Sequence, residues 1–464
     1  MSKRTGFVGS GHELTAVQES QSLFASQGAS DSPLPDLIPI LSYGMGVESS
    51  AILLRFLEEP DTFDFDLSKL VVIVAMTGDE WENTRTDVER YILPRIRQHN
   101  VRFVQVARAG HLQKKGIIVL DDGRQPHRLF ADGAYKLSHE LQSAGVVPAF
   151  AGQHKCSLKF KAFVIESWLQ QNVYGTAIRH TFGYNADELG RVAKSDQAIA
   201  RITFGFNSDE GARVKKGQAY DRPYRIGHYP LVEWGWDRQD CLLYIKEVTG
   251  VDWQKSACVY CPFARVDASM IARQKQFPDQ VSHAMVLERL ALAMNPRGQL
   301  YKQQPLYQIV SASGNRPALD LFHARLEKEP WGLYRVRRIY QPKAVYEGTG
   351  KLRKLLRYDN TKKGTAQRCV ERTAEFTNSA EALRQLRHIA VQNNFPVHLH
   401  HELSYATVSQ CGRTYPTSEE YYVAAPALVE TKARNGVADF DDDWNTMGDL
   451  YCGQDDVPNL FANV

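Results

Sequence analysis

The stretch that decides the fold class is LIPILSYGMGVESSAILLRFL, residues 37–57. Its first five residues are apolar and predict a strand, although Pro39 suits an edge strand or a strand start better than a strand centre. Residues 49–57 place apolar side chains on one helical face and therefore predict a helix. A strand, a loop with two glycines and a helix follow one another directly, which is typical of the start of an α/β domain.

The same alternation continues towards the C-terminus. The run Val71–Met76 predicts a buried strand, residues 88–96 predict a helix, and residues 101–106 predict a third strand. A β-α-β-α-β order predicts a parallel sheet with helices on both faces, that is, an α/β fold. Further patterns predict helices at 159–169, 239–248 and 286–294 and strands at 178–183 and 202–205. The alternation fades after about residue 266, where the pattern is mixed.

Length and composition limit the organisation of the chain. Its 464 residues exceed the usual size of a single core, and 43% apolar with 23% charged residues is typical of a globular protein. We expect a flexible arm at 1–35, an α/β domain at 36–265 and a mixed region at 266–464. The apolar runs are too short to span a membrane, and the N-terminus shows no secretory pattern. Seven cysteines in a long chain favour a reducing cytoplasm.

Residues 42–50, which we call the glycine loop, predict an anion site. Gly44 and Gly46 permit close approach of a ligand to the backbone, and the helix that follows exposes free N–H groups. The hydroxyls of Ser42, Ser49 and Ser50 add hydrogen-bond donors there. The loop lacks the Gly-Lys-Ser/Thr ending of a Walker A motif. The alternative is a plain glycine turn that is capped by serine.

An internal repeat supplies candidate phosphate ligands. The segment 181–192, TFGYNADELGRV, recurs as TFGFNSDEGARV at 203–214. Arg191 and Arg213 are candidates for bidentate phosphate contact, each three residues after a glutamate, Glu188 or Glu210. The alternative is two surface ion pairs. After the second strand, Asp79 and Glu82 would hold Mg²⁺ or would cap a helix.

These segments resemble the phosphoadenosine-phosphosulfate (PAPS) reductase-like branch of the PP-loop ATP pyrophosphatase superfamily. The resemblance covers about residues 37–265 and includes GMGVES at 44–49, TGDEWENT at 77–84, GFNSDEGAR at 205–213 and YPLVEWGWDRQDCLLYI at 229–245. The pattern Ser-Gly-Gly-x-Asp-Ser has Gly44, Met45 and Glu48 in place of its first Ser, a Gly and its Asp. The resemblance implies a Rossmann-like, adenine nucleotide alpha hydrolase-like fold. It also implies that the glycine loop, Thr77 and Glu210 contact the nucleotide.

The cysteines point to sulfur or metal chemistry. Cys258 and Cys261 form a CxxC, and Cys156 begins a helix beside Lys155 and Lys159, which favours a thiolate. With Cys241 they supply four thiolates, the number that a [4Fe–4S] cluster or a structural Zn²⁺ needs. Some similar proteins bind such a cluster. The alternatives are a redox-active or sulfur-carrying site without metal, with Cys156 and Lys159 as catalytic residues, and inert core cysteines.

Residues 331–374 form a basic stretch. They contain twelve lysines or arginines against three acidic residues, interleaved with aromatic residues. Cations bind phosphates and aromatic faces stack on bases, so we predict contact with DNA or RNA. The alternative is a solvated basic face. The acidic residues near 439–443 would shield this stretch or simply solubilise the tail.

The sequence therefore predicts a cytoplasmic PP-loop enzyme that binds ATP with Mg²⁺. By resemblance, it adenylates a substrate, preferably nucleic acid, for sulfur transfer from a donor protein. One rival is a sulfonucleotide (PAPS or APS) reductase, for which Cys452 would be the nucleophile. The other rival is a nucleotide- or nucleic-acid-binding module without catalysis.

Overall fold

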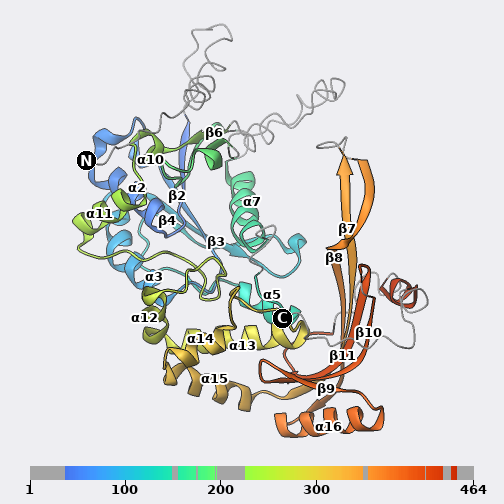
Figure 1. Cartoon of the computed structure of the whole chain (residues 1–464). Coiled ribbons are helices and arrows are strands. Elements are labelled where there is room, and N and C mark those ends of the chain that lie inside the picture. Colours follow the sequence, from blue (N-terminus) through green and yellow to red (C-terminus); the bar gives the residue numbers. More distant parts are fainter. Residues whose placement is uncertain are drawn as a thin grey trace, which may run out of the picture.

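The computed structural model describes residues 37–148, 155–173, 176–193, 195, 225–347, 354–412, 414–431 and 440–446. They form two sheets joined by a layer of helices (Figure 1). The expected arm at 1–35, the strand at 202–205, Glu210, Arg213 and Cys452 lie outside the described residues.

The first sheet has six strands in the order β4-β3-β2-β1-β5-β6. All neighbouring pairs are parallel except β3 with β4. The strands are β1 (Ile38–Ser42), β2 (Val71–Met76), β3 (Arg102–Arg108), β4 (Ile117–Gly123), β5 (Ile178–Thr181) and β6 (Arg225–His228). β1 lies between β2 and β5, so Pro39 is the second residue of a central strand and not part of an edge. The loop after β1 therefore lies at the point where the strand order reverses.

Helices cover both faces of this sheet, as predicted. Its helical segments are α2 (Val47–Glu58), η1 (Pro60–Thr62), η2 (Leu67–Lys69), α3 (Glu82–Asp87), η3 (Val88–Ile92), α4 (Leu93–Gln98), η4 (Gln113–Lys115), α5 (Leu137–Ala144), α6 (Lys155–Ser157), η5 (Leu158–Ala162), α7 (Phe163–Asn172), α10 (Pro230–Glu233) and α11 (Arg238–Thr249). Leu41 and Val72 pack with α2, α4 and α11 on one face. Ile40 and Ile73 pack with Val164 and Trp168 of α7 on the other face. The alternation of side chains along each strand produces these two separate apolar layers.

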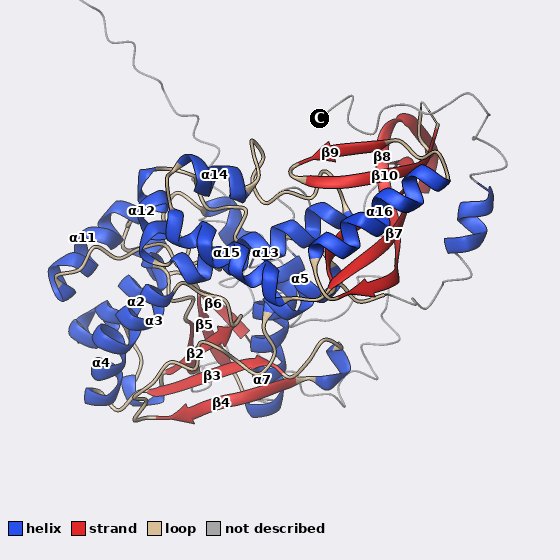
Figure 2. Ribbon diagram, turned by 90° about the horizontal axis from the view of Figure 1, so that it is seen from below, coloured by secondary structure: helices blue, strands red, loops and turns tan. Residues whose placement is uncertain are grey.

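A layer of four helices follows, where the sequence pattern was mixed. The helices are α12 (Ala268–Gln276), α13 (Pro278–Met294), α14 (Leu306–Ala312) and α15 (Arg316–Lys328). α13 is buried along most of its length (Figure 2). Its core is continuous with Trp81 and Phe160 of the first domain and with Tyr405 and Tyr421 of the second sheet. The chain at the expected domain boundary, residue 265, is therefore packed into a continuous core and does not form a linker that separates two domains.

The second sheet is antiparallel, with the order β8-β7-β11-β10-β9. Its elements are β7 (Trp331–Glu347), β8 (Lys354–Phe376), α16 (Ser379–Gln392), β9 (Val397–His400), β10 (Leu403–Cys411) and β11 (Thr417–Pro426). β7 and β8 continue beyond β11 as a two-stranded extension (Figure 1). We call this extension, residues 342–347 and 354–363, the ribbon. The basic stretch is therefore a β-hairpin.

Among the described residues, no helix combines the length and apolar character that crossing a membrane requires.

Candidate functional site

The glycine loop places the N-terminus of α2 directly after β1. Gly46 is the residue before α2, and no side chain of the described residues caps this helix end. The Ser49 hydroxyl turns back to the loop, where it accepts a hydrogen bond from Gly44 N at 3.2 Å. Met45 adopts a φ of 58° and is 1% exposed. A non-glycine residue with positive φ is strained, so the surrounding fold holds this loop in one shape.

A second glycine keeps the helix end open. Gly183 follows β5, the neighbour of β1, and a Cβ on it would lie 3.1 Å from Ser49 N and 3.3 Å from Glu48 Cβ. Any side chain at position 183 would therefore crowd the backbone N–H groups at the start of α2. The combination of an uncapped helix N-terminus and a neighbour without a side chain is suited to an anion.

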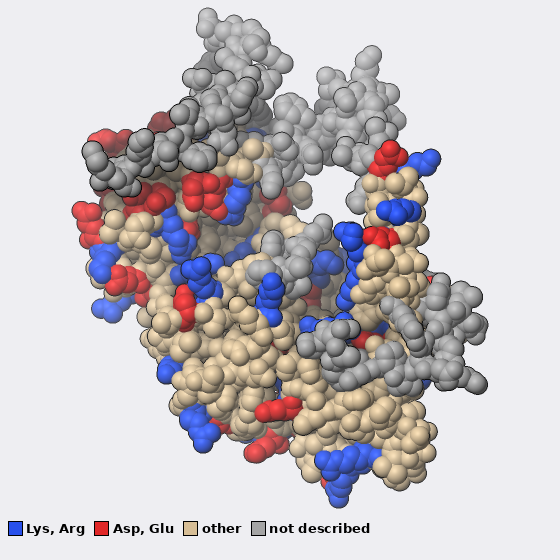
Figure 3. Space-filling model, in the orientation of Figure 1, with Lys and Arg blue, Asp and Glu red and all other residues tan. Residues whose placement is uncertain are grey.

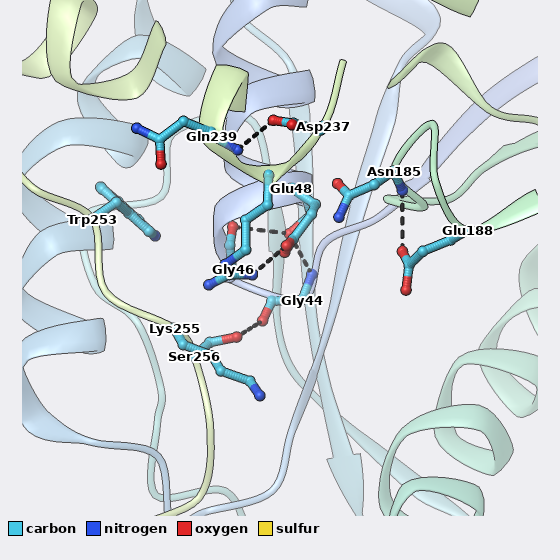
Figure 4. Close-up of polar contacts among 12 residues, drawn as sticks. Gly44, Gly46, Glu48, Asn185, Glu188, Asp237, Gln239, Trp253, Lys255 and Ser256 are labelled. Carbon is cyan, nitrogen blue, oxygen red and sulfur yellow. Dashed lines mark hydrogen bonds and ion pairs between the residues drawn. The ribbon is translucent and has the colours of Figure 1, made fainter. Parts of the chain in front are cut away.

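Three residues from two further segments hold the glycine loop and the start of α2 (Figure 4). Ser256 Oγ donates to Gly44 O at 2.8 Å, and Trp253 Nε1 donates to Met45 O at 3.2 Å. Arg238, in the first turn of α11, forms an ion pair with Glu48. These contacts join the loop to the segment that precedes the CxxC.

All three expected serine hydroxyls are used within the fold, since Ser49 Oγ also donates a hydrogen bond to Gly46 O at 3.4 Å. Ser42 Oγ lies 2.7 Å from His180 Nε2. Burial, with a smaller effect of Arg225, lowers the pKa of His180 to about 3, so its imidazole is neutral. Ser50 is fully buried, with its Oγ 3.2 Å from the Tyr43 hydroxyl, which corrects the expectation that it faces a ligand.

The loop after β2 contacts the CxxC segment. Thr77 Oγ1 lies 3.2 Å from Cys258 Sγ. Asp79 Oδ2 accepts hydrogen bonds from Ser138 N at 2.8 Å and from the Tyr260 hydroxyl at 2.6 Å. Asp79 therefore links the start of α5 and the CxxC segment to the loop after β2. Its hydrogen bond to the first turn of α5 is the helix-capping role that was the alternative to Mg²⁺ binding.

Glu82, the first residue of α3, forms an ion pair with Arg85. Glu82 and Asp79 also line a polar cavity of about 750 Å³ together with Lys136 and His283. Within the described ranges, no three His, Cys, Asp or Glu side chains are arranged to hold a metal ion. Magnesium would therefore depend on ligands from a nucleotide's phosphates as well as on these carboxylates.

Three of the four expected cysteines, Cys156, Cys258 and Cys261, lie around Lys161, and we call them the thiol cluster. The charges of all three raise the pKa of Lys161, after the larger effect of Glu80. Burial raises the pKa of Cys258 and Cys261, so both are protonated thiols at neutral pH. These thiols become nucleophilic only when a nearby positive charge or a metal ion stabilises the thiolate form.

Cys241 does not belong to this cluster. It is fully buried in α11 with Ile245 and Leu53, in the core on the α2 face of the first sheet. Burial, with Glu48 and Asp240, raises its pKa to about 12. The set of four thiolates is therefore not assembled, so among the described residues the cysteines do not supply the ligands that a [4Fe–4S] cluster or a structural Zn²⁺ needs.

The lysine beside the thiols is Lys161 and not Lys159. Lys159 extends to Glu140, half exposed, whereas Lys161 lies 3.7 Å from Glu80. Residues 158–162 form one π-helical turn, which is wider than an α-helical turn and changes which side chains face inward. The sequence singled out Lys159 as a cation close to Cys156 in the chain, whereas the fold places Lys161 towards Glu80 and the cysteines.

The repeat is described only in its first copy. Arg191 is 59% exposed and forms an ion pair with Glu188, and its guanidinium lies 4.5 Å from the centre of the Tyr184 ring. At Arg191 the structure therefore shows the surface ion pair that was the alternative to phosphate contact. Asn185, which the sequence analysis passed over, is buried near the glycine loop (Figure 4). Its Oδ1 is buried without a hydrogen-bond partner among the described residues.

Much of the charge of the basic stretch is neutralised within the fold. Arg335 pairs with Glu420, and Arg338 pairs with Glu419. Arg337 pairs with Asp441 at 2.8 Å and lies against the rings of Phe440 and Trp444. The acidic segment at 440–446 therefore covers one face of the second sheet. The basic residues of the ribbon, Lys343, Lys354, Arg357, Lys362 and Lys363, are exposed.

Comparisons with protein families, with curated proteins and with solved structures each find no match for this chain.

Proposed function

We propose that this chain is a PP-loop enzyme that binds ATP at the glycine loop, adenylates a substrate and exchanges the AMP for sulfur. The observation that carries the proposal is the uncapped start of α2, kept open by Gly183. The position of this loop at the reversal of strand order suits the adenine nucleotide alpha hydrolase-like fold expected from the sequence. The free N–H groups of α2 would bind phosphoryl oxygens of ATP.

The first step is adenylation. A substrate oxygen attacks the α-phosphorus of ATP, the bond between the α-phosphorus and its bridging oxygen breaks, and pyrophosphate leaves. Charge on the leaving group increases during this step, and the dipole of α2 stabilises it. Magnesium, when bound with the nucleotide, would neutralise further phosphate charge. Arg238 is positioned to help, because its partner Glu48 lies in the first turn of α2.

The second step uses the thiol cluster. A donor protein delivers sulfur as a persulfide to one thiol, and the terminal sulfur of that persulfide attacks the activated atom of the substrate. AMP leaves, and a second thiol releases the product sulfur while a disulfide forms. A cellular dithiol then reduces this disulfide. The contacts of Ser256 and Thr77 join the thiol cluster to both nucleotide loops, and thiol chemistry of this kind suits a reducing cytoplasm.

Calorimetric titration with ATP tests the first step. Gly183→Val fills the space beside Ser49 N, so we expect ATP affinity to fall at least about tenfold, or about 1.4 kcal/mol. Gly190→Val is the matched control, because no atom lies within 4 Å of a Cβ at that position. Equal affinities of both variants, with thermal midpoints like that of the wild type, would contradict ATP binding at this loop.

Product analysis separates the rival functions. Pyrophosphate release from ATP with an oligonucleotide supports adenylation. Sulfite release from PAPS or APS supports the reductase. ATP binding without pyrophosphate release across candidate substrates supports a binding module, for which the departures Gly44, Met45 and Glu48 from the PP-loop pattern are the best argument.

A further inference from the structure

Three cations surround one aromatic ring at the foot of the ribbon. The Tyr340 ring centre lies 4.2 Å from Lys363 Nζ, 5.0 Å from the Arg338 guanidinium and 5.6 Å from the Arg297 guanidinium. We call Arg297, Arg338 and Lys363 the cation cluster. Arg297 follows α13, Arg338 lies on β7 and Lys363 lies on β8, so residues distant in sequence meet here.

Among the described residues, one carboxylate, that of Glu419, contacts these cations. Glu419 lies 3.3 Å from Arg338 and 3.5 Å from Arg297, and it accepts a hydrogen bond from the Tyr340 hydroxyl at 2.6 Å. Three positive charges against one negative charge leave an excess of two positive charges among these described residues. Glu419 is 2% exposed, so the site is built into the fold.

Two of the cations, Arg338 and Lys363, lack either a hydrogen-bond partner or a full compensation of their charge among the described residues. The Arg338 side chain is 8% exposed, and its Nε is buried without a partner in the described part of the chain. Burial and the nearby Arg338 and Arg297 lower the pKa of Lys363 to about 8, although Glu419 opposes this effect. A bound anion would lower the free energy of all three cations.

The ribbon extends from this cluster with a surface suited to a polyanion. Its exposed aromatic residues are Tyr346 and Tyr358, at 43% and 56% exposure. Lys343, Lys354 and Arg357 are exposed on the same two strands, and Arg357 is the neighbour of Tyr358. Figure 3 shows Lys and Arg side chains along the side of the ribbon that faces the first domain. Exposed rings that alternate with cations favour unpaired bases, because stacking requires free base faces.

We infer that the cation cluster binds a backbone phosphate of single-stranded nucleic acid that runs along the ribbon towards the first domain. This inference names the acceptor of the proposed enzyme and in that respect depends on the proposed function. The binding itself requires no nucleotide, so it can be measured separately.

Fluorescence anisotropy with labelled oligo(dT) and oligo(rU) tests the inference on the full-length chain. The double variant Lys363→Ala with Arg297→Ala should bind the preferred strand about tenfold more weakly. Each phosphate contact that is lost should also reduce the slope of the logarithm of affinity against the logarithm of salt concentration by about one. Arg387→Ala on α16 is the control for loss of an exposed arginine and should bind like the wild type. Wild-type affinity should fall from pH 7 to pH 9, whereas Lys363→Arg should remain constant because arginine stays charged.

Several results would overturn the inference. They are unchanged binding in the double variant, no binding of either strand at low salt, tighter binding of a duplex of the same length, and equal binding of poly-glutamate. Gly183→Val separates the two proposals. If it loses ATP but binds oligonucleotide normally, the nucleotide site and the cation cluster are independent sites. If the wild-type protein binds ATP but does not bind the oligonucleotide, only the inference about the cation cluster is wrong.

Discussion

Ser256 Oγ donates a hydrogen bond to Gly44 O at 2.8 Å, so the segment that carries Cys258 and Cys261 is fixed to the glycine loop. The two segments are about 200 residues apart in the sequence, and only the fold brings them together. A Cβ on Gly46 would lie 2.9 Å from the same Oγ, which shows how closely they approach. A nucleotide on the glycine loop would therefore lie next to the segment that leads to the thiol cluster.

Ser256→Ala should weaken ATP binding while it leaves the fold intact. Loss of this hydrogen bond costs about 1 kcal/mol and frees the Gly44 carbonyl, so ATP affinity should fall about threefold to fivefold. Titration calorimetry measures the affinity, and denaturant unfolding measures the stability. Ser311→Ala on the exposed face of α14 should change neither quantity. Equal ATP affinity in both variants would show that the link is irrelevant to nucleotide binding.

Cys241→Ala should retain sulfur loading, whereas Cys258→Ala should lose it. Cys241 lies in the core apart from the thiol cluster, so its replacement costs only about 1 kcal/mol of stability. Mass spectrometry of the intact protein after treatment with a persulfide donor counts the sulfur atoms added. Iron, sulfide and zinc contents of anaerobically purified protein provide a second readout. A loss of metal in Cys241→Ala equal to that in Cys258→Ala would contradict the separation of Cys241 from the cluster.

Lys161→Met should destabilise the protein, whereas Lys159→Met should change stability by less than about 0.5 kcal/mol. Glu80 is 2% exposed at its side chain, and without Lys161 it would be a buried charge with only Thr77 as donor. We expect a loss of about 2 kcal/mol, below the cost of a fully buried pair because Lys161 is 38% exposed. Denaturant unfolding measures the loss. Addition of Glu80→Gln should restore most of it, and a double variant no more stable than Lys161→Met would contradict the pairing.

Glu288 should make the stability of the protein fall as pH rises from about 4.5 to 7. Burial raises the pKa of Glu288 to about 7, although hydrogen bonds from Leu300 N and Leu306 N oppose this effect. The folded state therefore binds a proton more tightly than the unfolded state, so this stabilisation is full below about pH 4.5 and is lost through pH 7.

The matched variant is Glu288→Gln, which cannot titrate. Across this window the wild type should lose up to about 3 kcal/mol relative to the variant in the free energy of unfolding. Urea unfolding at intervals of pH measures the difference. A difference between the two proteins that stays constant with pH would refute the assignment.

The sequence alone determined the first sheet in large part. β2 has the predicted bounds Val71–Met76, and the predicted helix at 239–248 differs from α11 by one residue at each end. These elements are continuous in sequence, and their apolar periodicity records which face is buried. The edge strand β4 was missed because both of its faces are partly exposed. β7 and β8 of the second sheet were missed because the charged residues of the basic stretch interrupt their apolar pattern.

Tertiary structure decided which of the predicted site residues meet. The fold places Cys156, Cys258 and Cys261 around Lys161 and leaves Cys241 in the core, and Lys159 lies elsewhere. It also buries Ser50 and brings Arg297 close to Arg338 and Lys363. Residue types and local spacing are properties of the chain, so the sequence could identify the glycine loop and the cysteines. Contacts between distant segments depend on how whole elements pack, because a single helical turn or strand register reverses the direction of a side chain.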